Sequence, residues 1–96
     1  MTSFRVELNG VNFWIDFEGT PCRMGFYTER YVVAGDLREA ELAAVQLLRG
    51  DPKLQQALNE KDDPPMIYAE GIIEVEPGDI PDVAPGLAFY AEDEDA

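Results

Sequence analysis

The chain has 96 residues, of which 46% are hydrophobic and 28% are charged, a balance typical of a single globular domain. It contains 20 acidic residues, 7 basic residues and no histidine, so its net charge is −13. Proteins that bind a nucleic-acid backbone need an excess of lysine and arginine, and this class is therefore excluded. Zinc sites of the His or paired-Cys type and Ser-His-Asp or Cys-His catalytic sets are excluded too, because the chain has one cysteine and no histidine.

The negative charge lies almost entirely in the C-terminal third. Residues 1–61 carry all 7 basic residues and 9 acidic ones, whereas residues 62–96 carry 11 acidic residues and no basic one. Two interpretations stay open: a solvated, frayed tail, or an acidic surface that meets a basic partner. The members of this candidate acidic surface are Asp79, Asp82, Glu92, Asp93, Glu94 and Asp95.

The N-terminal residues show none of the features of a signal peptide, because apolar and charged side chains alternate from the start. No apolar run reaches the roughly 18 residues needed to span a bilayer. A single cysteine, Cys22, cannot form an internal disulfide and so implies no oxidising compartment. Together these features predict a cytoplasmic protein that does not associate with membranes.

Alternating apolar and polar residues predict three strands in the first third of the chain. Residues 3–9 and 11–17 alternate cleanly, and Asn9-Gly10 between them is a preferred sequence for a two-residue hairpin turn. The apolar face of the second run consists of Val11, Phe13, Ile15 and Phe17. Residues 24–34 are rich in aromatic and β-branched side chains and predict the third strand.

Two helices and a last strand are expected next. Asp36 is the predicted N-cap of the first helix and Gly50 its predicted stop. The apolar stripe of this helix consists of Leu37, Ala40, Ala44, Leu47 and Leu48. Asp51 begins a shorter helix, and residues 66–76 predict the last strand. Residues 77–96 are rich in proline and glycine, which predicts an extended tail that is either free or docked on the sheet.

This order of elements predicts an α+β fold. We expect a small, antiparallel-rich, four-stranded sheet of order β-β-β-α-α-β, with the helices on one face. Residues 1–76 would form a single domain, and residues 77–96 an acidic Pro/Gly-rich C-terminal extension.

The second face of this sheet is expected to carry an unusual number of aromatic side chains. Its predicted members are Trp14, Tyr27, Tyr31 and Tyr68. Exposing several aromatic side chains to water is energetically unfavourable, so we expect another segment or molecule to cover this face. Three alternatives remain: the chain's own tail, a second copy of the chain, or a different partner.

Three segments carry a resemblance to a known family. Residues 25–32 read GFYTERYV, residues 39–45 read EAELAAV and residues 64–68 read PPMIY. Together they resemble a family of short bacterial cytoplasmic proteins with a Gly-Phe-aromatic-Thr-x-Arg-aromatic-Val strand, an Ala/Glu-rich helix and a Pro-Pro-Met-Ile-Tyr strand. The resemblance covers residues 4–76 and leaves the acidic tail outside it. That family has no established activity, so the resemblance implies no substrate and no catalytic residues. It directs attention to Arg30, Thr28 and the aromatic residues around them.

Carboxylates are the remaining candidates for chemistry. Asp16, Glu18 and Glu29 are expected near one another on an outward strand face, and such groups coordinate Mg²⁺ or Ca²⁺ or transfer protons. In a chain with 20 acidic residues, neighbouring carboxylates also arise without any function.

Arg30 is the most informative basic residue, because it lies inside a strand between aromatic residues. Its guanidinium either recognises a carboxylate or phosphate, or makes a cross-strand ion pair. The expected ion-pair partners are Glu7, Asp16 and Glu70.

The favoured function is a non-enzymatic protein-interaction module, homodimeric through the aromatic sheet face. The alternative is an acidic inhibitor or nucleic-acid mimic that binds a basic groove of another protein. No catalytic residue, metal, cofactor, direct nucleic-acid partner or membrane contact is expected. The predicted binding residues are Trp14, Tyr27, Arg30, Tyr31 and Tyr68.

Overall fold

The computed structural model describes residues 1–83 and 85–92. Its elements, in chain order, are β1 (Thr2–Phe17), β2 (Thr20–Ala34), α1 (Leu37–Arg49), α2 (Pro52–Gln55), β3 (Met66–Val75), the 3₁₀ turn η1 (Pro77–Asp79) and β4 (Ala88–Ala91).

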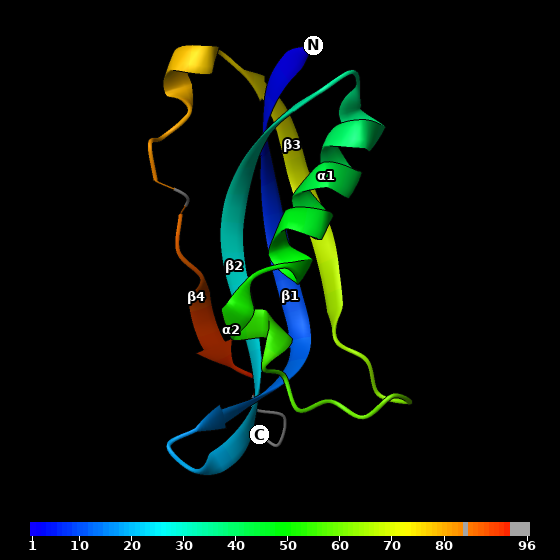
Figure 1. Ribbon diagram of the computed structural model, residues 1–96, viewed down its shortest axis with the longest axis vertical. Coiled ribbons are helices and arrows are strands. Elements are labelled where there is room, and N and C mark those ends of the chain that lie inside the picture. Colours follow the sequence, from blue (N-terminus) through cyan, green and yellow to red (C-terminus); the bar gives the residue numbers. More distant parts are fainter. Residues whose placement is uncertain (84, 93–96) are drawn as a thin grey trace.

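One antiparallel sheet organises the molecule. Its strand order is β3-β1-β2-β4, and each neighbouring pair of strands is antiparallel. The helix α1 lies across one face of this sheet, and the molecule is elongated, with extents of 43 × 26 × 25 Å (Figure 1). The expected α+β class with a four-stranded antiparallel sheet and two short helices is confirmed.

The predicted hairpin turn at Asn9-Gly10 is wrong. Both residues lie within β1, and the strand continues to Phe17 with a bulge between Gly10 and Phe13. Asn12 takes a left-handed backbone in this bulge (φ 60°), a conformation that asparagine tolerates. The turn that joins β1 to β2 lies instead at residues 18–19, where both φ angles are positive.

The apolar face predicted for residues 11–17 is only partly correct. Phe13 is buried, Val11 and Ile15 are half-buried, and Phe17 is 54% exposed. The reason is length, because β1 and β2 extend together beyond the end of α1 (Figure 1). No helix of the described residues covers the end of this hairpin.

The core lies between α1 and the face of the sheet that carries Phe4, Val6 and Leu8. Asp36 caps α1 as predicted, since its carboxylate accepts a hydrogen bond from the Glu39 N–H (2.9 Å). The helix buries its small residues together with one leucine, namely Ala40, Ala44 and Leu48. The wider stripe that was expected is wrong, because Leu37 and Leu47 are exposed. Alanines bring the helix close to the sheet, so a narrow contact strip is sufficient.

The segment after Pro77 contributes a strand. β4 pairs with residues 24–27 of β2, and the Phe89 ring contacts the Phe26 ring edge-on, with centroids 5.8 Å apart. Beyond β4, the Glu92 N–H donates to the Arg23 carbonyl (3.0 Å). This segment therefore adds a strand at the edge of the sheet, next to β2 (Figure 1).

Candidate interaction surface

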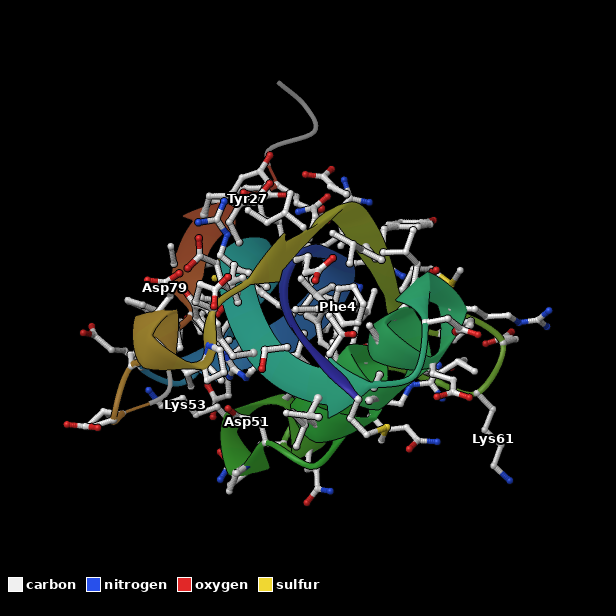
Figure 2. All side chains as sticks on the ribbon, turned by 90° about the horizontal axis from the view of Figure 1, so that it is seen from above. Phe4, Tyr27, Asp51, Lys53, Lys61 and Asp79 are labelled. Atoms are coloured by element: carbon white, nitrogen blue, oxygen red, sulfur yellow. The ribbon has the colours of Figure 1, made fainter. Side chains whose placement is uncertain are left out.

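The sheet face opposite α1 gathers four tyrosines, and we call it the tyrosine face. Because strand side chains alternate, residues on β1 that flank the buried Val6 and Leu8 point to this side. Tyr27 lies there, on the side of the sheet away from the helices (Figure 2). The members of the tyrosine face are Arg5, Glu7, Asn9, Tyr27, Glu29, Tyr31, Tyr68, Glu70, Ile73, Val75 and Tyr90.

Two of the tyrosines form a fixed platform. The Tyr27 and Tyr90 rings are stacked, with centroids 5.2 Å apart and an interplanar angle of 30°. The Asn9 amide donates to the Tyr90 hydroxyl (3.1 Å) and to the Phe26 carbonyl (2.9 Å). A Cβ atom at position 25 would overlap the Tyr90 ring, so glycine is required for this close approach. The ring of Tyr27, a residue that is 53% exposed, therefore packs on a Tyr90 ring that is itself held by a hydrogen bond.

Three glutamates surround a hollow beside this platform. Glu7 and Glu29 are directly opposite each other on β1 and β2, and Glu70 lies at the bulge of β3. Together with Tyr27 they line a hollow of about 240 Å³ that has no basic residue in its lining. Like charges directly across two strands are unfavourable, so this arrangement has an energetic cost.

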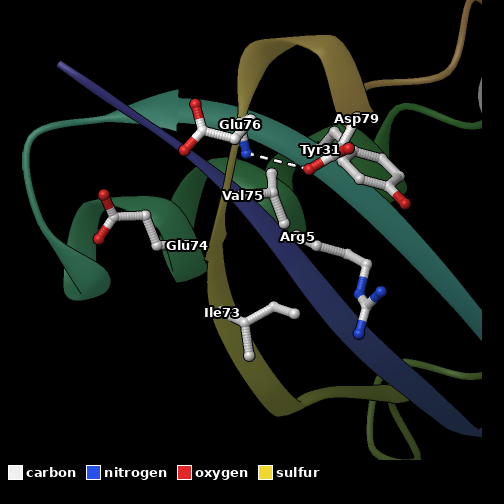
Figure 3. Close-up of a pocket in the computed structure, with 7 residues that line it drawn as sticks. All are labelled: Arg5, Tyr31, Ile73, Glu74, Val75, Glu76 and Asp79. Carbon is white, nitrogen blue, oxygen red and sulfur yellow. Dashed lines mark hydrogen bonds between the residues drawn. The ribbon is translucent and has the colours of Figure 1, made fainter.

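Arg5, which lies on β1 two residues before Glu7, offsets part of this repulsion between the carboxylates. Its guanidinium Nη2 lies 3.4 Å from the Glu7 carboxylate, and its Nε lies 3.8 Å from the Glu29 carboxylate. Arg5 also lines a larger hollow of about 670 Å³ at the other end of the face, with Tyr31 and Asp79 among its walls (Figure 3). The tyrosine face therefore has a mixed end near Arg5 and an acidic end near Tyr27.

The acidic end changes the titration of its tyrosine. The pKa of Tyr27 is raised above the ordinary value of 10.0, mainly by the neighbouring Tyr90 and to a smaller extent by partial burial and by the Glu70 carboxylate. Because the folded chain holds this proton more tightly than the unfolded chain, the stability that it contributes is complete below pH 10 and is lost at higher pH.

We expect Tyr90→Phe to return the pKa of Tyr27 toward 10.0, and Glu70→Gln to do so by a smaller amount. An NMR titration of the Tyr27 Cζ signal measures this pKa directly. The exposed Glu41 on α1 provides the control, since Glu41→Gln removes an equal charge far from the sheet face. Unchanged titration in both test variants would mean that neither neighbour sets the pKa.

The structure brings Tyr27, Tyr31 and Tyr68 together and places the other two predicted binding residues elsewhere. Trp14 lies near the end of the hairpin, where it lines a hollow with Pro21 and residues 58–60, 62 and 63. Arg30 lies on the helix side of the sheet and is buried. Its guanidinium donates to the Thr28 hydroxyl (2.8 Å) and to the Pro85 carbonyl (3.0 Å).

The predicted ion-pair partners of Arg30 are wrong. The observed partner is Asp51, the N-cap of α2, at 3.7 Å. Arg30 points to the helix side, because it shares the strand parity of the buried Phe26 and Val32. Its role in this structure is to tie the chain before β4 and the start of α2 to the sheet.

The predicted acidic surface does not form one patch in the described part of the chain. Asp79 accepts from the Glu76 N–H in η1 (3.2 Å), and Asp82 is exposed in the following loop. Glu92 lies at the other end of this segment, where its carboxylate accepts from the Asn12 N–H (2.9 Å) and is mostly covered. Residues 93–95 (Asp93, Glu94 and Asp95) lie outside the described residues.

The outward carboxylates Asp16, Glu18 and Glu29 do not form a metal site. Among residues 1–83 and 85–92, no three His, Cys, Asp or Glu side chains converge to hold a metal ion. The acidic residues that line one hollow, Glu7, Glu29 and Glu70, were not predicted as a group. Their only sequence signals were the strand parity of Glu7 and the position of Glu70 next to Gly71.

Comparisons with protein-family models, with curated proteins and with solved structures find no significant match. The family resemblance over residues 4–76 therefore stays a prediction. In the part of the chain that the structure describes, no helix is long and apolar enough to cross a membrane.

Proposed function

We propose that this protein is a non-enzymatic interaction module whose tyrosine face binds a basic surface of another protein. The observation that carries the proposal is the hollow between Glu7, Glu29 and Glu70, next to the exposed ring of Tyr27. Tyrosines combine apolar area with a hydroxyl and are enriched at protein interfaces. A lysine or arginine side chain can form an ion pair with a carboxylate and pack on the neighbouring aromatic ring.

The chemistry of the face favours a basic partner over a second copy of the chain. Packing two copies face to face would bury both sets of Glu7, Glu29 and Glu70, while Arg5 is the one basic side chain among the described members of the tyrosine face. That guanidinium already lies near Glu7 and Glu29 of its own chain. Burying carboxylates without cationic partners is unfavourable, so a homodimer through this face is the weaker alternative.

The acidic inhibitor that the charge distribution suggests would also bind a basic partner, but through its C-terminal acids. The two possibilities differ in which residues contact that partner. If the tyrosine face is the contact, neutralising it abolishes binding and removing residues 93–96 does not.

The test is affinity capture of basic proteins from the native host, followed by binding measurements with the purified partner. We expect Glu7→Gln/Glu29→Gln to weaken binding at least tenfold, about the effect of losing one charge-assisted contact. The control Glu18→Gln/Glu41→Gln removes the same charge from exposed positions away from the hollow and should retain binding. Binding should also weaken as salt increases.

Two results would contradict the proposal. One is binding that survives the face variant but is lost on truncation of residues 93–96. The other is a dimer in light-scattering measurements of the purified chain that Tyr27→Ser converts to a monomer, because a second copy would then occupy the face.

A further inference from the structure

A second hollow lies at the hairpin end of the molecule, on residues that the tyrosine face does not use. Its volume is about 410 Å³, which is within the range of small binding sites. Its lining combines apolar and acidic residues around Asn59. The apolar residues are Trp14, Pro21 and Leu58, and the acidic ones, which we call the rim residues, are Glu60, Asp62 and Asp63.

The wall of this hollow is held in place by hydrogen bonds to β1. The Trp14 backbone carbonyl accepts a hydrogen bond from the Leu58 backbone N–H (2.7 Å). The Trp14 backbone N–H donates to the side-chain oxygen of Asn59 (3.1 Å). The Asn59 amide in turn donates to the carbonyls of Asn12 (2.8 Å) and Asp63 (2.9 Å). The loop that carries the acidic residues is therefore fixed against the strand that carries the indole.

The charges of the rim residues are not neutralised within the part of the chain that the structure describes. Asp63 accepts a hydrogen bond from the Asn12 amide (2.9 Å), but the carboxylates of Glu60 and Asp62 have no hydrogen bond or ion pair within residues 1–83 and 85–92. Lys61, which lies between them in the sequence, is exposed and extends away from the molecule (Figure 2). The lining of this hollow thus combines a tryptophan with two carboxylates, those of Glu60 and Asp62, that no described residue neutralises.

We propose that this hollow, which we call the Trp14 pocket, binds an arginine side chain of a partner polypeptide. A guanidinium is planar, so it can lie on the indole face while its N–H groups donate to the Glu60 and Asp62 carboxylates. A lysine ammonium has no plane to stack and is more strongly hydrated, so the pocket favours arginine. This inference does not depend on the tyrosine face, because the two sites share no lining residue.

Trp14 is the sole tryptophan of the chain, so its fluorescence reports on this pocket alone. The probe is acetyl-Gly-Arg-Gly-amide, and its matched control replaces arginine by citrulline, which has nearly the same shape and no charge. We expect the arginine peptide to change Trp14 emission with a saturable, millimolar affinity. The citrulline peptide should bind at least about fivefold more weakly, since it loses the charge-assisted contacts.

Variants of Glu60 and Asp62 distinguish binding in the Trp14 pocket from nonspecific attraction of the peptide to an acidic protein. Glu60→Gln/Asp62→Asn should weaken binding of the arginine peptide about fivefold, whereas Glu41→Gln/Glu74→Gln, at exposed positions away from the hairpin end, should not. Circular dichroism checks that the rim variant stays folded, and NMR shifts of the Trp14 indole N–H provide a second readout. Equal binding of the two peptides, or an unchanged affinity in the rim variant, would overturn the inference.

The same titration distinguishes failure of this site from failure of the proposed function. In Glu7→Gln/Glu29→Gln the arginine peptide should still shift the Trp14 signal. If that variant instead loses the Trp14 response, the pocket is not the binding site and the inference fails.

Discussion

Replacing Arg30 by methionine should lower the free energy of unfolding by about 3 kcal/mol. Methionine fills much of the same space but donates no hydrogen bond. It would leave the Pro85 carbonyl and the Asp51 carboxylate without the guanidinium that now contacts them at 3.0 Å and 3.7 Å. Urea unfolding of the variant and the parent chain measures the difference.

The same variant should loosen one part of the sheet more than the rest. Because Arg30 holds the chain just before β4, amide hydrogen exchange in residues 88–91 should speed up more than exchange in the centre of β1. Arg38→Met, at an exposed position on α1, is the matched control and should change stability by less than about 0.5 kcal/mol. A stable Arg30 variant with unchanged exchange in β4 would show that the guanidinium does not tie this strand to the sheet.

Gly10→Ala should destabilise the fold by about 3 kcal/mol. A Cβ atom at position 10 would overlap the Phe26 ring, which is fully buried and packed against Phe13 and Phe89. The ring has no free space to move into, so the strand or the ring must shift. Thermal or urea unfolding measures the loss.

A double-mutant cycle tests the cause. In a Phe26→Leu background, Gly10→Ala should cost less than about 1 kcal/mol, because the overlapping ring atoms are gone. Gly78→Ala is the control, since a Cβ atom there would meet nothing within 4 Å. If Gly10→Ala costs as much with leucine at position 26, the ring overlap is not the reason for glycine at this position.

Gly10 also explains why the hairpin was misplaced. Asn-Gly is a local turn signal, but here the missing side chain of Gly10 makes room for Phe26 on the neighbouring strand. The contact between Gly10 and Phe26, which are 16 positions apart, outweighs the local preference of Asn-Gly for a turn. A short stretch of sequence around Asn9-Gly10 does not reveal this contact. The alternation of residues 3–9, in contrast, needs only one covered face, and it predicted that part of the strand correctly.

Part of the tyrosine face was also predictable from the alternation of side chains along a strand. Tyr27 and Tyr31 share one parity of β2, and the opposite parity carries Phe26 and Arg30. The sequence therefore contained the signal that separates Arg30 from the tyrosines. Tyr90 could not be predicted, because it reaches the face through a short strand in a Pro/Gly-rich segment whose docking depends on tertiary contacts.

Trp14 illustrates the limit of strand parity. A bulge between Gly10 and Phe13 changes the phase of β1, and the strand then extends past the sheet centre. There the Trp14 backbone forms hydrogen bonds with Leu58 and Asn59, which lie more than 40 residues further along the chain. Neither the bulge nor that contact has a local sequence signature.

The most direct test of the account is to locate where a basic ligand contacts the chain. The measurement is an amide NMR titration of the full chain with a decalysine peptide at about 0.15 M ionic strength, where nonspecific attraction is screened. We expect the largest shifts at Glu7, Tyr27, Glu29 and Glu70, and we expect these shifts to be lost in Glu7→Gln/Glu29→Gln. Shifts concentrated at the C-terminal acids, with the tyrosine face unchanged, would contradict it.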